Sequence, residues 1–221
     1  MKRIVIAVDG LSSTGKSSMA KQLAQKLGYT FIDSGAMYRA ITLYFIRHNI
    51  DLNNSEEVVL ALSQIKLQFN EQNQMCLNGE NVAEAIRTAE VSGMVSPVST
   101  LAPVRTFAVA QQQAMGEAKG MVMDGRDIGT TVFPNAELKI YLMASEEVRC
   151  QRRYEELKAK DPSIQMEAVR ANLLERDYID THREISPLRK AADAVELDNS
   201  FLSLNETIEA AYQMALSRMS N

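Results

Sequence analysis

Short apolar runs and segments of helical periodicity alternate along most of the chain. Residues 4–8 (IVIAV) form one continuous apolar run, as expected for a parallel strand that is covered on both faces. From residue 16 the apolar positions recur every four residues, and Gly28 follows where a C-terminal glycine cap belongs. The chain is therefore predicted to begin with a strand, a glycine-rich turn and a helix.

The same alternation recurs further along the chain. More strands are predicted at 29–32, 121–123, 138–143 and 194–197, with a helix at 36–47. A last helix is predicted to begin at Ser203, because Glu206 three residues later completes a capping box. Strands that alternate with helices predict an α/β fold, a doubly wound parallel sheet of five strands.

One stretch departs from this alternation. Residues 65–69 alternate apolar and polar side chains, and an Asn-Gly pair at 78–79 follows a further apolar run. An Asn-Gly pair between such runs is the strongest short-range signal for a β-hairpin. Because these antiparallel strands lie between units of the parallel sheet, residues about 53–98 are predicted to form a small inserted β/α subdomain.

Composition narrows the classes of function. The chain has 221 residues, 46% of them hydrophobic, which is enough for one buried core. Its 28 acidic residues outnumber its 24 Lys and Arg, and this acidic balance argues against a nucleic-acid-binding surface. Cys76 and Cys150 lack a neighbouring Cys or His at metal-ligand spacing and are interpreted as reduced packing residues. The first apolar run is too short for a signal sequence or a membrane span, which favours a cytoplasmic location.

The turn after the first strand carries the strongest chemical signal. Residues 10–17 read GLSSTGKS and match the phosphate loop GxxxxGK[ST] between a predicted strand and a predicted helix. Inward-facing backbone N–H groups and the start of the helix bind phosphate in such loops. The expected ATP-binding residues are Gly10, Leu11, Ser12, Ser13, Thr14, Gly15, Lys16, Ser17 and Ser18.

Two of these residues have specific expected roles. The Lys16 ammonium should reach the β- and γ-phosphates of the nucleotide. The Ser17 hydroxyl should bind Mg²⁺, which bridges those phosphates and neutralises charge during phosphoryl transfer.

Two polar turns follow predicted strands, at the sheet edge where ligands of parallel sheets bind. Residues 33–39 (DSGAMYR) place Ser34 and Arg39 at the start of a helix. Ser34 could equally cap this helix, and Arg39 could be solvated. Residues 124–127 (DGRD) place Arg126 between two carboxylates, and a guanidinium pairs well with phosphate oxygens.

A third polar segment, ERDYIDTHR at 175–183, is dominated by charged residues. Arg176, Asp180 and Arg183 are spaced i, i+4 and i+7, so a helix would place both arginines beside one carboxylate. A solvated ladder of salt bridges would have the same spacing. His182 has no catalytic partner at a recognisable spacing and is interpreted as peripheral.

Taken in order, these motifs resemble those of the bacterial cytidylate kinases, in the nucleoside monophosphate kinase superfamily. The resemblance covers nearly the whole chain, in the segments IAVDGLSSTGKSS, FIDSGAMYR, IRTAEVSGMVSPVSTLAPVR, DGRDIGTTVFP, ERDYIDTHREISPL and ADAVELDNS. It implies transfer of the ATP γ-phosphoryl group to CMP or dCMP, giving ADP and CDP or dCDP, with Mg²⁺ required. We expect a monomer that acts on these small molecules without nucleic-acid or membrane partners.

The resemblance also implies roles for individual residues. Those expected to bind CMP are Ser34, Arg39, Ser96, Arg105, Arg126, Asp127, Arg176, Asp180 and Arg183. Among them, Ser34, Arg39 and Arg126 match residues that bind the monophosphate, and Ser96, Arg105 and Asp127 match residues that read the cytosine. Asp180 resembles a ribose-contacting carboxylate, with Arg176 and Arg183 near the phosphates. The expected catalytic residues are Lys16, Arg126, Arg153 and Arg176.

The inserted subdomain resembles the monophosphate-binding insert of the family, and the arginine-rich helices at about 146–184 resemble its mobile lid. Arg152 and Arg153 are adjacent and cannot both face the site from one helix, and Arg153 is favoured. We expect a single P-loop kinase domain with a core of residues 1–52, 99–145 and 185–221.

Three rival interpretations make different predictions. A small-molecule kinase of the same fold, such as a shikimate kinase, would share the phosphate loop but lack the antiparallel insert and the DGRD and ERDYID segments. A guanine-nucleotide switch protein would carry an NKxD sequence, which does not occur. A non-enzymatic nucleic-acid-binding module would need a basic face with interleaved aromatic residues, whereas only 6% of the residues are aromatic.

Overall fold

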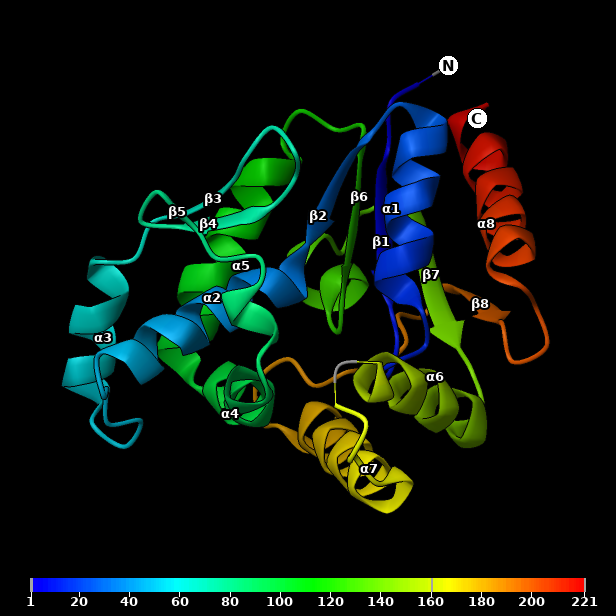
Figure 1. Ribbon diagram of the computed structural model, residues 1–221. Coiled ribbons are helices and arrows are strands. Elements are labelled where there is room, and N and C mark those ends of the chain that lie inside the picture. The colour runs from blue at the N-terminus through cyan, green and yellow to red at the C-terminus, as the bar shows by residue number, and fades with distance from the viewer. Residues whose placement is uncertain (1, 160, 221) are drawn as a thin grey trace. The chain divides into compact units, whose positions relative to one another are not determined.

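Five strands form the central sheet in the order β2 (Thr30–Asp33), β6 (Met121–Gly125), β1 (Val5–Asp9), β7 (Leu138–Met143) and β8 (Val195–Asp198). Strand β1 pairs in parallel with β6 and with β7, and β7 pairs in parallel with β8. The computed structural model describes residues 2–159 and 161–220. It confirms the predicted parallel sheet and its five strands, each to within one or two residues (Figure 1).

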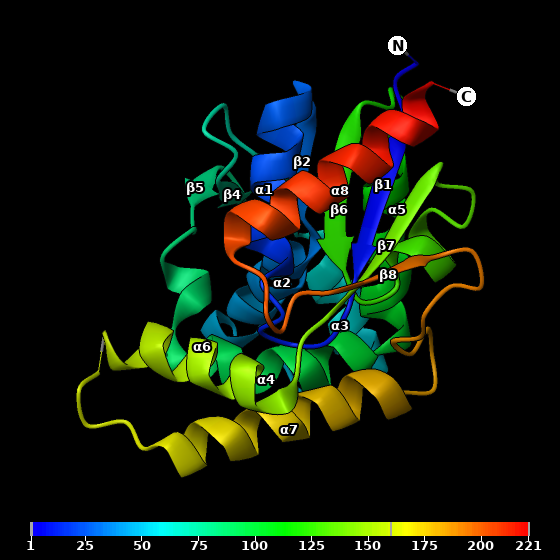
Figure 2. The same ribbon diagram turned by 90° about the vertical axis from the view of Figure 1, so that its right-hand side faces the viewer.

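The sheet belongs to a compact unit made of residues 1–32 and 118–221. Helices α1 (Lys16–Leu27) and α8 (Leu204–Met219) lie side by side against the sheet (Figures 1 and 2). Ile4, directly before β1, and Ile6 and Val8 within it are fully buried in one core cluster, which also contains Met19 and Leu23 of α1 and Ala211 of α8. The continuous apolar run of β1 is therefore explained by its central position in the sheet.

The ends of these two helices follow their sequence signals. Gly28 ends α1 in the left-handed conformation, with φ of 65°, and its N–H binds a carbonyl of the last turn. At the start of α8, the Ser203 hydroxyl accepts from the Glu206 N–H while the Glu206 carboxylate accepts from the Ser203 N–H. Both predicted caps are confirmed.

Two arginine-containing helices pack on each other in the same unit. Helices α6 (Glu146–Lys158) and α7 (Met166–His182) run side by side in both ribbon views (Figures 1 and 2). A single turn of π-helix, η2 (Ile128–Val132), follows β6 and was not predicted from the sequence.

Residues 33–117 form the second compact unit. Its helical elements are α2 (Ser34–Arg47), α3 (Ser55–Ser63), η1 (Ala85–Arg87), α4 (Ala89–Thr100) and α5 (Ala102–Gly116). An antiparallel sheet comprises β3 (Leu67–Phe69), β4 (Met75–Leu77) and β5 (Glu80–Asn81). Asn78 and Gly79 both have positive φ, as a tight hairpin turn requires. The predicted insert of about 53–98 lies inside this unit, and the predicted division into core, insert and lid stays a prediction.

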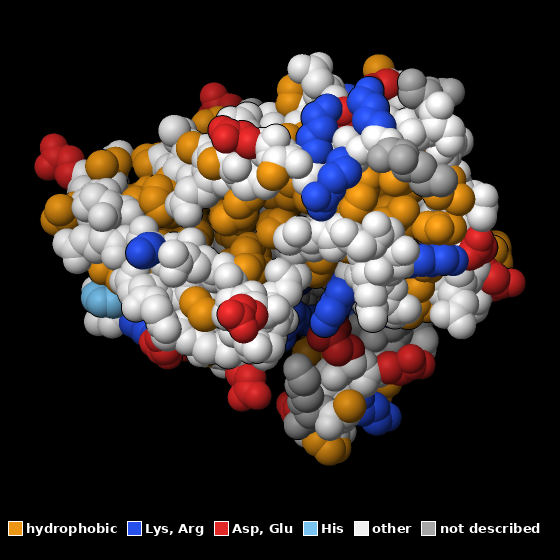
Figure 3. Space-filling view, turned by 90° about the horizontal axis from the view of Figure 1, so that it is seen from above, with side chains coloured by type: hydrophobic (Ala, Val, Ile, Leu, Met, Phe, Trp, Pro, Cys, Tyr) orange, Lys and Arg blue, Asp and Glu red, His pale blue; other side chains and the backbone are white. Residues whose placement is uncertain are grey.

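Surface properties add little to this picture. Within the described residues, no helix combines the length and the apolar character that a membrane span requires. On the face shown in Figure 3, Lys and Arg side chains stand in small groups among uncharged and acidic ones, without a continuous basic surface.

The capping box of α8 provides a test of the fold. We expect Ser203→Ala to lower the free energy of unfolding by about 1 kcal/mol, because the Ser203 hydroxyl loses both the hydrogen bond that it accepts from the Glu206 N–H and the one that it donates to the Glu206 carboxylate. Chemical denaturation would measure this change. Ser220→Ala, at the other end of α8, is the control and should cost clearly less; equal losses would contradict the assigned cap.

Candidate active site

The phosphate loop connects β1 to α1 and depends on three residues with positive φ. Gly10, Ser13 and Gly15 have φ of 151°, 60° and 88°. A Cβ at Gly10 would lie 2.2 Å from the carbonyl oxygen of Leu142 in β7, so only glycine fits there. The loop is thus bent tightly against the carboxyl end of the sheet.

Lys16, the first residue of α1, is buried beneath this loop. Its Nζ donates to the Leu11 carbonyl at 2.5 Å and to the Thr14 hydroxyl at 3.3 Å. Burial, and after it repulsion from Arg126, holds the pKa of Lys16 well below its ordinary value. A bound polyphosphate would favour the charged form of this ammonium.

The Ser17 hydroxyl donates to Oδ2 of Asp124 at 2.6 Å. The two residues meet because β1 and β6 pair in parallel with Val8 opposite Asp124, so that both strands end beside the loop. A hydroxyl and a carboxylate are hard oxygen ligands of the kind that Mg²⁺ prefers, and the pair fits a magnesium ion. From the sequence, Ser17 is the only residue predicted to bind the metal. The one feature of the sequence that could have indicated Asp124 is its position at the carboxyl end of a predicted strand.

The described residues contain no group of three or more His, Cys, Asp or Glu that could hold a metal ion. Mg²⁺ commonly keeps several waters and takes further ligands from nucleotide phosphates. A site of one hydroxyl and one carboxylate therefore suits a metal that arrives with a nucleotide.

Arg126 connects β6 to both the phosphate loop and α7. Its Nε donates to Asp180 Oδ2 at 2.7 Å, and its Nη2 donates to the Ser12 hydroxyl at 2.9 Å. The Asp180 side chain is 6% exposed. The guanidinium is therefore oriented by two partners from different elements.

The predicted arrangement of Asp180 between Arg176 and Arg183 is wrong in one respect. Helix α7 ends at His182, so Arg183 is its cap residue and leaves the helical face. Arg183 instead donates from Nη2 to Asp127 at 3.2 Å and from Nε to the Ser186 carbonyl at 2.9 Å. His182 is exposed and stacks on Tyr178, a peripheral position.

Arg176 of α7 lies close enough to Arg126 for the two charges to repel each other. Its Nε is buried and has no hydrogen-bond partner among residues 2–159 and 161–220. Burial, followed by repulsion from Arg126, lowers the pKa of Arg176 to about 10. Lys16, which is buried, and Arg126 and Arg176, which are partly exposed, together make a cationic group, and an anion would offset the repulsion that Arg126 exerts on the other two.

Asp9, the last residue of β1, supports the segment that carries Arg126. Its two carboxylate oxygens accept from the N–H groups of Ile128 at 2.8 Å and Gly129 at 2.7 Å, at the start of η2. Burial raises the pKa of Asp9 to about 6, although these two hydrogen bonds oppose the rise. Sequence reasoning did not select Asp9, because an acidic residue at a strand end gives no partner from its spacing.

The second unit groups a different set of predicted residues. Arg39 of α2 donates from Nη1 to the Ser92 hydroxyl at 2.9 Å and to the Ile86 carbonyl at 3.1 Å. Ser34, the first residue of α2, is buried. The alternative that Ser34 caps this helix is wrong, because the N-cap is Asp33. Ser92 was not predicted, and its position within the AEVSGMVSPVS helix gave no separate signal.

Arg105 of α5 is 2% exposed, which is rare for an arginine. Its Nη1 donates to the Ser99 carbonyl at 3.3 Å, and its guanidinium lies 5.6 Å from the centre of the Tyr38 ring. The Ser99 hydroxyl in turn donates to the carbonyl of Ser96, which is also buried. Helices α2, α4 and α5 thus bring Ser96 and Arg105 into one polar cluster.

Arg152 and Arg153 of α6 have different partners. Arg152 donates to the Thr14 carbonyl and to the carbonyl and side-chain oxygens of Asn199, each at 3.1 Å. Arg153, the predicted lid arginine, pairs with Glu156 on its own helix at 2.8 Å. Arg152 and Arg153 do face different surroundings, as their adjacency predicts.

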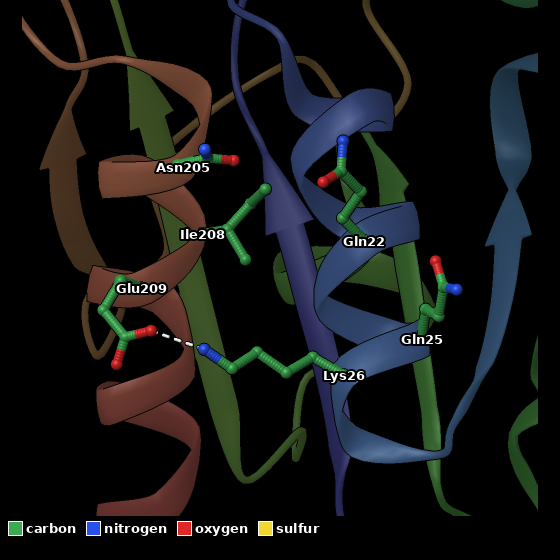
Figure 4. A pocket seen from close by; sticks show the side chains of 6 residues that line it. All are labelled: Gln22, Gln25, Lys26, Asn205, Ile208 and Glu209. Atoms are coloured by element: carbon green, nitrogen blue, oxygen red, sulfur yellow. Dashed lines mark hydrogen bonds and ion pairs between the residues drawn. The ribbon is translucent and has the colours of Figure 1, made fainter.

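A surface pocket between α1 and α8 contains none of these residues. Figure 4 shows the Lys26–Glu209 ion pair crossing it, and both partners are substantially exposed. Its lining consists of Gln22, Gln25, Lys26, Asn205, Ile208 and Glu209.

A phosphate loop between the first strand and the first helix of a parallel sheet, with cationic side chains beside it, defines a P-loop kinase. The chain of a shikimate kinase from Acinetobacter baumannii, solved in complex with shikimate, has a TM-score of 0.51 and 15% identity, with 100% of this chain and 97% of that one covered. This likeness shows the fold alone.

The sequence comparisons are more specific. The model of the cytidylate kinase family matches residues 6–217. Curated cytidylate kinases from Bacteroides thetaiotaomicron and Flavobacterium psychrophilum are 55% and 56% identical to this chain, covering 95% and 93% of it and 95% of each relative. The chain belongs to the cytidylate kinase family. The predicted family and the predicted class of enzyme, an ATP-dependent nucleoside monophosphate kinase, are confirmed.

The buried carboxyl of Asp9 predicts a pH dependence. Its pKa is raised in the folded protein, so its stabilising contribution is complete below the unfolded value of 3.8 and is lost as the pH rises through about 6. Relative to Asp9→Asn, the native chain should gain about 1 kcal/mol of unfolding free energy between pH 7 and pH 5. Urea denaturation at both pH values, without nucleotide, would measure this.

Asp161→Asn is the matched control. Hydrogen bonds from Ser163 lower the pKa of that exposed carboxylate below 3.8, so it stays ionised in the folded and the unfolded chain between pH 7 and pH 5, and Asp161→Asn should track the native chain over this range. A difference between the native chain and Asp9→Asn that did not change with pH would contradict the described environment of Asp9.

Proposed function

We propose that the chain transfers the γ-phosphoryl group of ATP to CMP or dCMP, releasing ADP and CDP or dCDP, with Mg²⁺ required. Membership of the cytidylate kinase family supports the reaction. The single observation that carries the proposal is the cationic group of Lys16, Arg126 and Arg176 beside the phosphate loop, of which Lys16 is buried. Its mutual repulsion makes it suited to several phosphates at once.

On the donor side, the phosphate loop and Lys16 bind the β- and γ-phosphates of ATP. Ser17 and Asp124 would hold Mg²⁺, which supplies neutralising positive charge between the phosphates when bound. The Ser17 hydroxyl already lies within hydrogen-bond distance of the carboxylate, so little rearrangement of the protein is needed.

For the transfer itself, Arg126 and Arg176 stabilise the charge that spreads over the transferred phosphoryl group. Phosphoryl transfer depends mainly on positioning and on electrostatic stabilisation, and fixed guanidinium groups serve both. Asp180 and Ser12 orient Arg126, as its two hydrogen bonds show. Arg176, whose Nε lacks a partner among the described residues, has a donor available for the nucleotides.

For the acceptor, Ser34, Arg39 and Arg126 bind the monophosphate, and Asp180 contacts the ribose, with Arg183 nearby. Ser96, Arg105 and Asp127 read the cytosine, whose amino group donates and whose ring nitrogen and carbonyl accept. Uracil reverses part of this pattern and would leave buried polar groups unpaired, which is a strong basis for discrimination. The low exposure of Arg105 and Ser96 supports a role in such a site.

Some properties of the whole protein remain predictions from the sequence alone. They are the lid at about 146–184 with Arg153 as its active arginine, a monomeric state, a cytoplasmic location, and the lack of nucleic-acid and membrane partners.

Acceptor specificity tests the proposed reaction directly. We expect ADP to form from ATP and Mg²⁺ when CMP or dCMP is supplied, and to form at least about 100-fold less efficiently with UMP, AMP, GMP or shikimate. A coupled assay for ADP, with each acceptor alone, measures this. Preferred turnover of shikimate or of a purine monophosphate would overturn the proposed roles of Ser96, Arg105 and Asp127.

Two single substitutions separate donor from acceptor functions. Arg126→Ala should lower kcat/KM for CMP by about 10²–10³-fold while ATP binding stays within a few-fold, because its guanidinium is proposed to contact the acceptor and the transferred group. Lys16→Ala should weaken ATP binding as well as turnover. Arg189→Ala, at an exposed position, is the control. Equal losses of ATP and CMP binding in Arg126→Ala, with a lowered Tm, would point to misfolding instead.

A further inference from the structure

Ser12 of the phosphate loop has all of its polar atoms bound by protein groups. Its N–H donates to Asp177 Oδ1 at 3.0 Å, and its carbonyl accepts from Arg149 Nη1 at 3.1 Å. Its hydroxyl accepts from Arg126, as described above. No other residue of the loop is described with partners on its N–H, its carbonyl and its side chain together.

The two residues that hold the Ser12 backbone also form an ion pair with each other. Arg149 of α6 and Asp177 of α7 pair through Nη1 and Oδ2, and the residues are 4% and 7% exposed. Neither was selected from the sequence, where both belong to charged helical stretches. A buried ion pair is weak evidence for stability, since apolar residues often serve as well. Its contacts with Ser12 therefore suggest another purpose.

The direction of each peptide in the loop shows what this purpose is. In a planar trans peptide, the carbonyl and the following N–H point in opposite directions. The Leu11 carbonyl accepts from the Lys16 ammonium, whereas the Ser12 N–H of the same peptide donates to Asp177. Asp177 thus lies on the side of the loop opposite to the Lys16 ammonium.

The orientation of the next peptide, between Ser12 and Ser13, can be derived in the same way. The Ser12 carbonyl points to Arg149, which is paired with Asp177 and lies on the same outer side. The N–H of Ser13 must then point toward the side of the Lys16 ammonium, where phosphate binds. Ser13 has φ of 60°, a conformation that non-glycine residues adopt only when their surroundings impose it.

We propose that Arg149 and Asp177 are positioning residues for ATP: together they hold the Ser12 peptides so that the Ser13 N–H faces the nucleotide phosphates. This inference rests on the proposed function for the identity of the nucleotide. The Arg149–Asp177 pair also connects the buried sides of α6 and α7 to the phosphate loop. Arg152 and Asn199 both donate to the Thr14 carbonyl, and the N–H of the same peptide, that of Gly15, is thereby directed toward the phosphates.

The test uses Arg149→Lys in the full-length chain. Lysine keeps a positive charge on the same helix face, but its shorter side chain does not bring the ammonium to the position of Nη1, from which both Ser12 and Asp177 are reached. We expect the Kd for ATP with Mg²⁺, measured by calorimetry without an acceptor, to rise about tenfold. KM for CMP should change less than about twofold.

Arg170→Lys is the matched control. Arg170 lies on α7 and pairs with Glu146 of α6, so it joins the same two helices, but its side chain is 58% exposed and has no described contact with the loop. Its ATP affinity should equal that of the native chain.

Amide hydrogen exchange provides a readout that overall destabilisation would not imitate. In Arg149→Lys, exchange of the Ser12 N–H should quicken about tenfold, while amides in β1 and β7 keep their native rates. Unchanged ATP affinity with an unchanged Ser12 rate would overturn the proposal. Parallel loss of ATP and CMP binding with faster exchange throughout the sheet would also overturn it, because the pair would then serve the fold alone. The ATP measurement needs no acceptor, so failure of CMP turnover in the native chain would leave this test intact.

Discussion

The direction of backbone N–H groups in residues 10–16 is the constraint on which the rest of the site depends. A loop that binds phosphate must turn several N–H groups to one side, and each peptide that does so turns its carbonyl to the other. The outward carbonyls and N–H groups are buried, so they need partners of their own. Arg149, Arg152, Asp177 and Asn199 provide these partners from α6, α7 and the segment after β8.

The sheet fixes where this loop lies. Gly10 packs against the β7 backbone with no room for a side chain, and α1 begins directly after the loop. The parallel pairing of β1 with β6 brings Asp124 to Ser17, and Asp9 holds the start of η2 through two backbone hydrogen bonds. The donor loop and the Arg126 segment are thus tied to the same strand ends.

Charge is the second organising feature. Lys16, Arg126 and Arg176 are close enough for repulsion and burial to lower the pKa of Lys16 and Arg176, whereas Asp180 pairs with Arg126. Buried charges are costly unless they are paired. Asp180 is the carboxylate that pairs directly with this group, through Arg126, and nucleotide phosphates would add negative charge beside Lys16 and Arg176. The same requirement explains why the chain as a whole can be acidic while its site binds anions.

The sequence by itself determined the five strands, the caps of α1 and α8, the hairpin at Asn78-Gly79, the phosphate loop and the family. These features depend on local periodicity, on residues with special φ preferences, and on motifs whose members are close in the chain. Only the tertiary structure decided which charges meet. Arg126 pairs with Asp180 across 54 positions, and Ser12 binds Asp177 across 165. Arg183 leaves the face of α7 because the helix ends one residue earlier. Such pairings depend on how strands and helices pack, and no spacing along the chain encodes them.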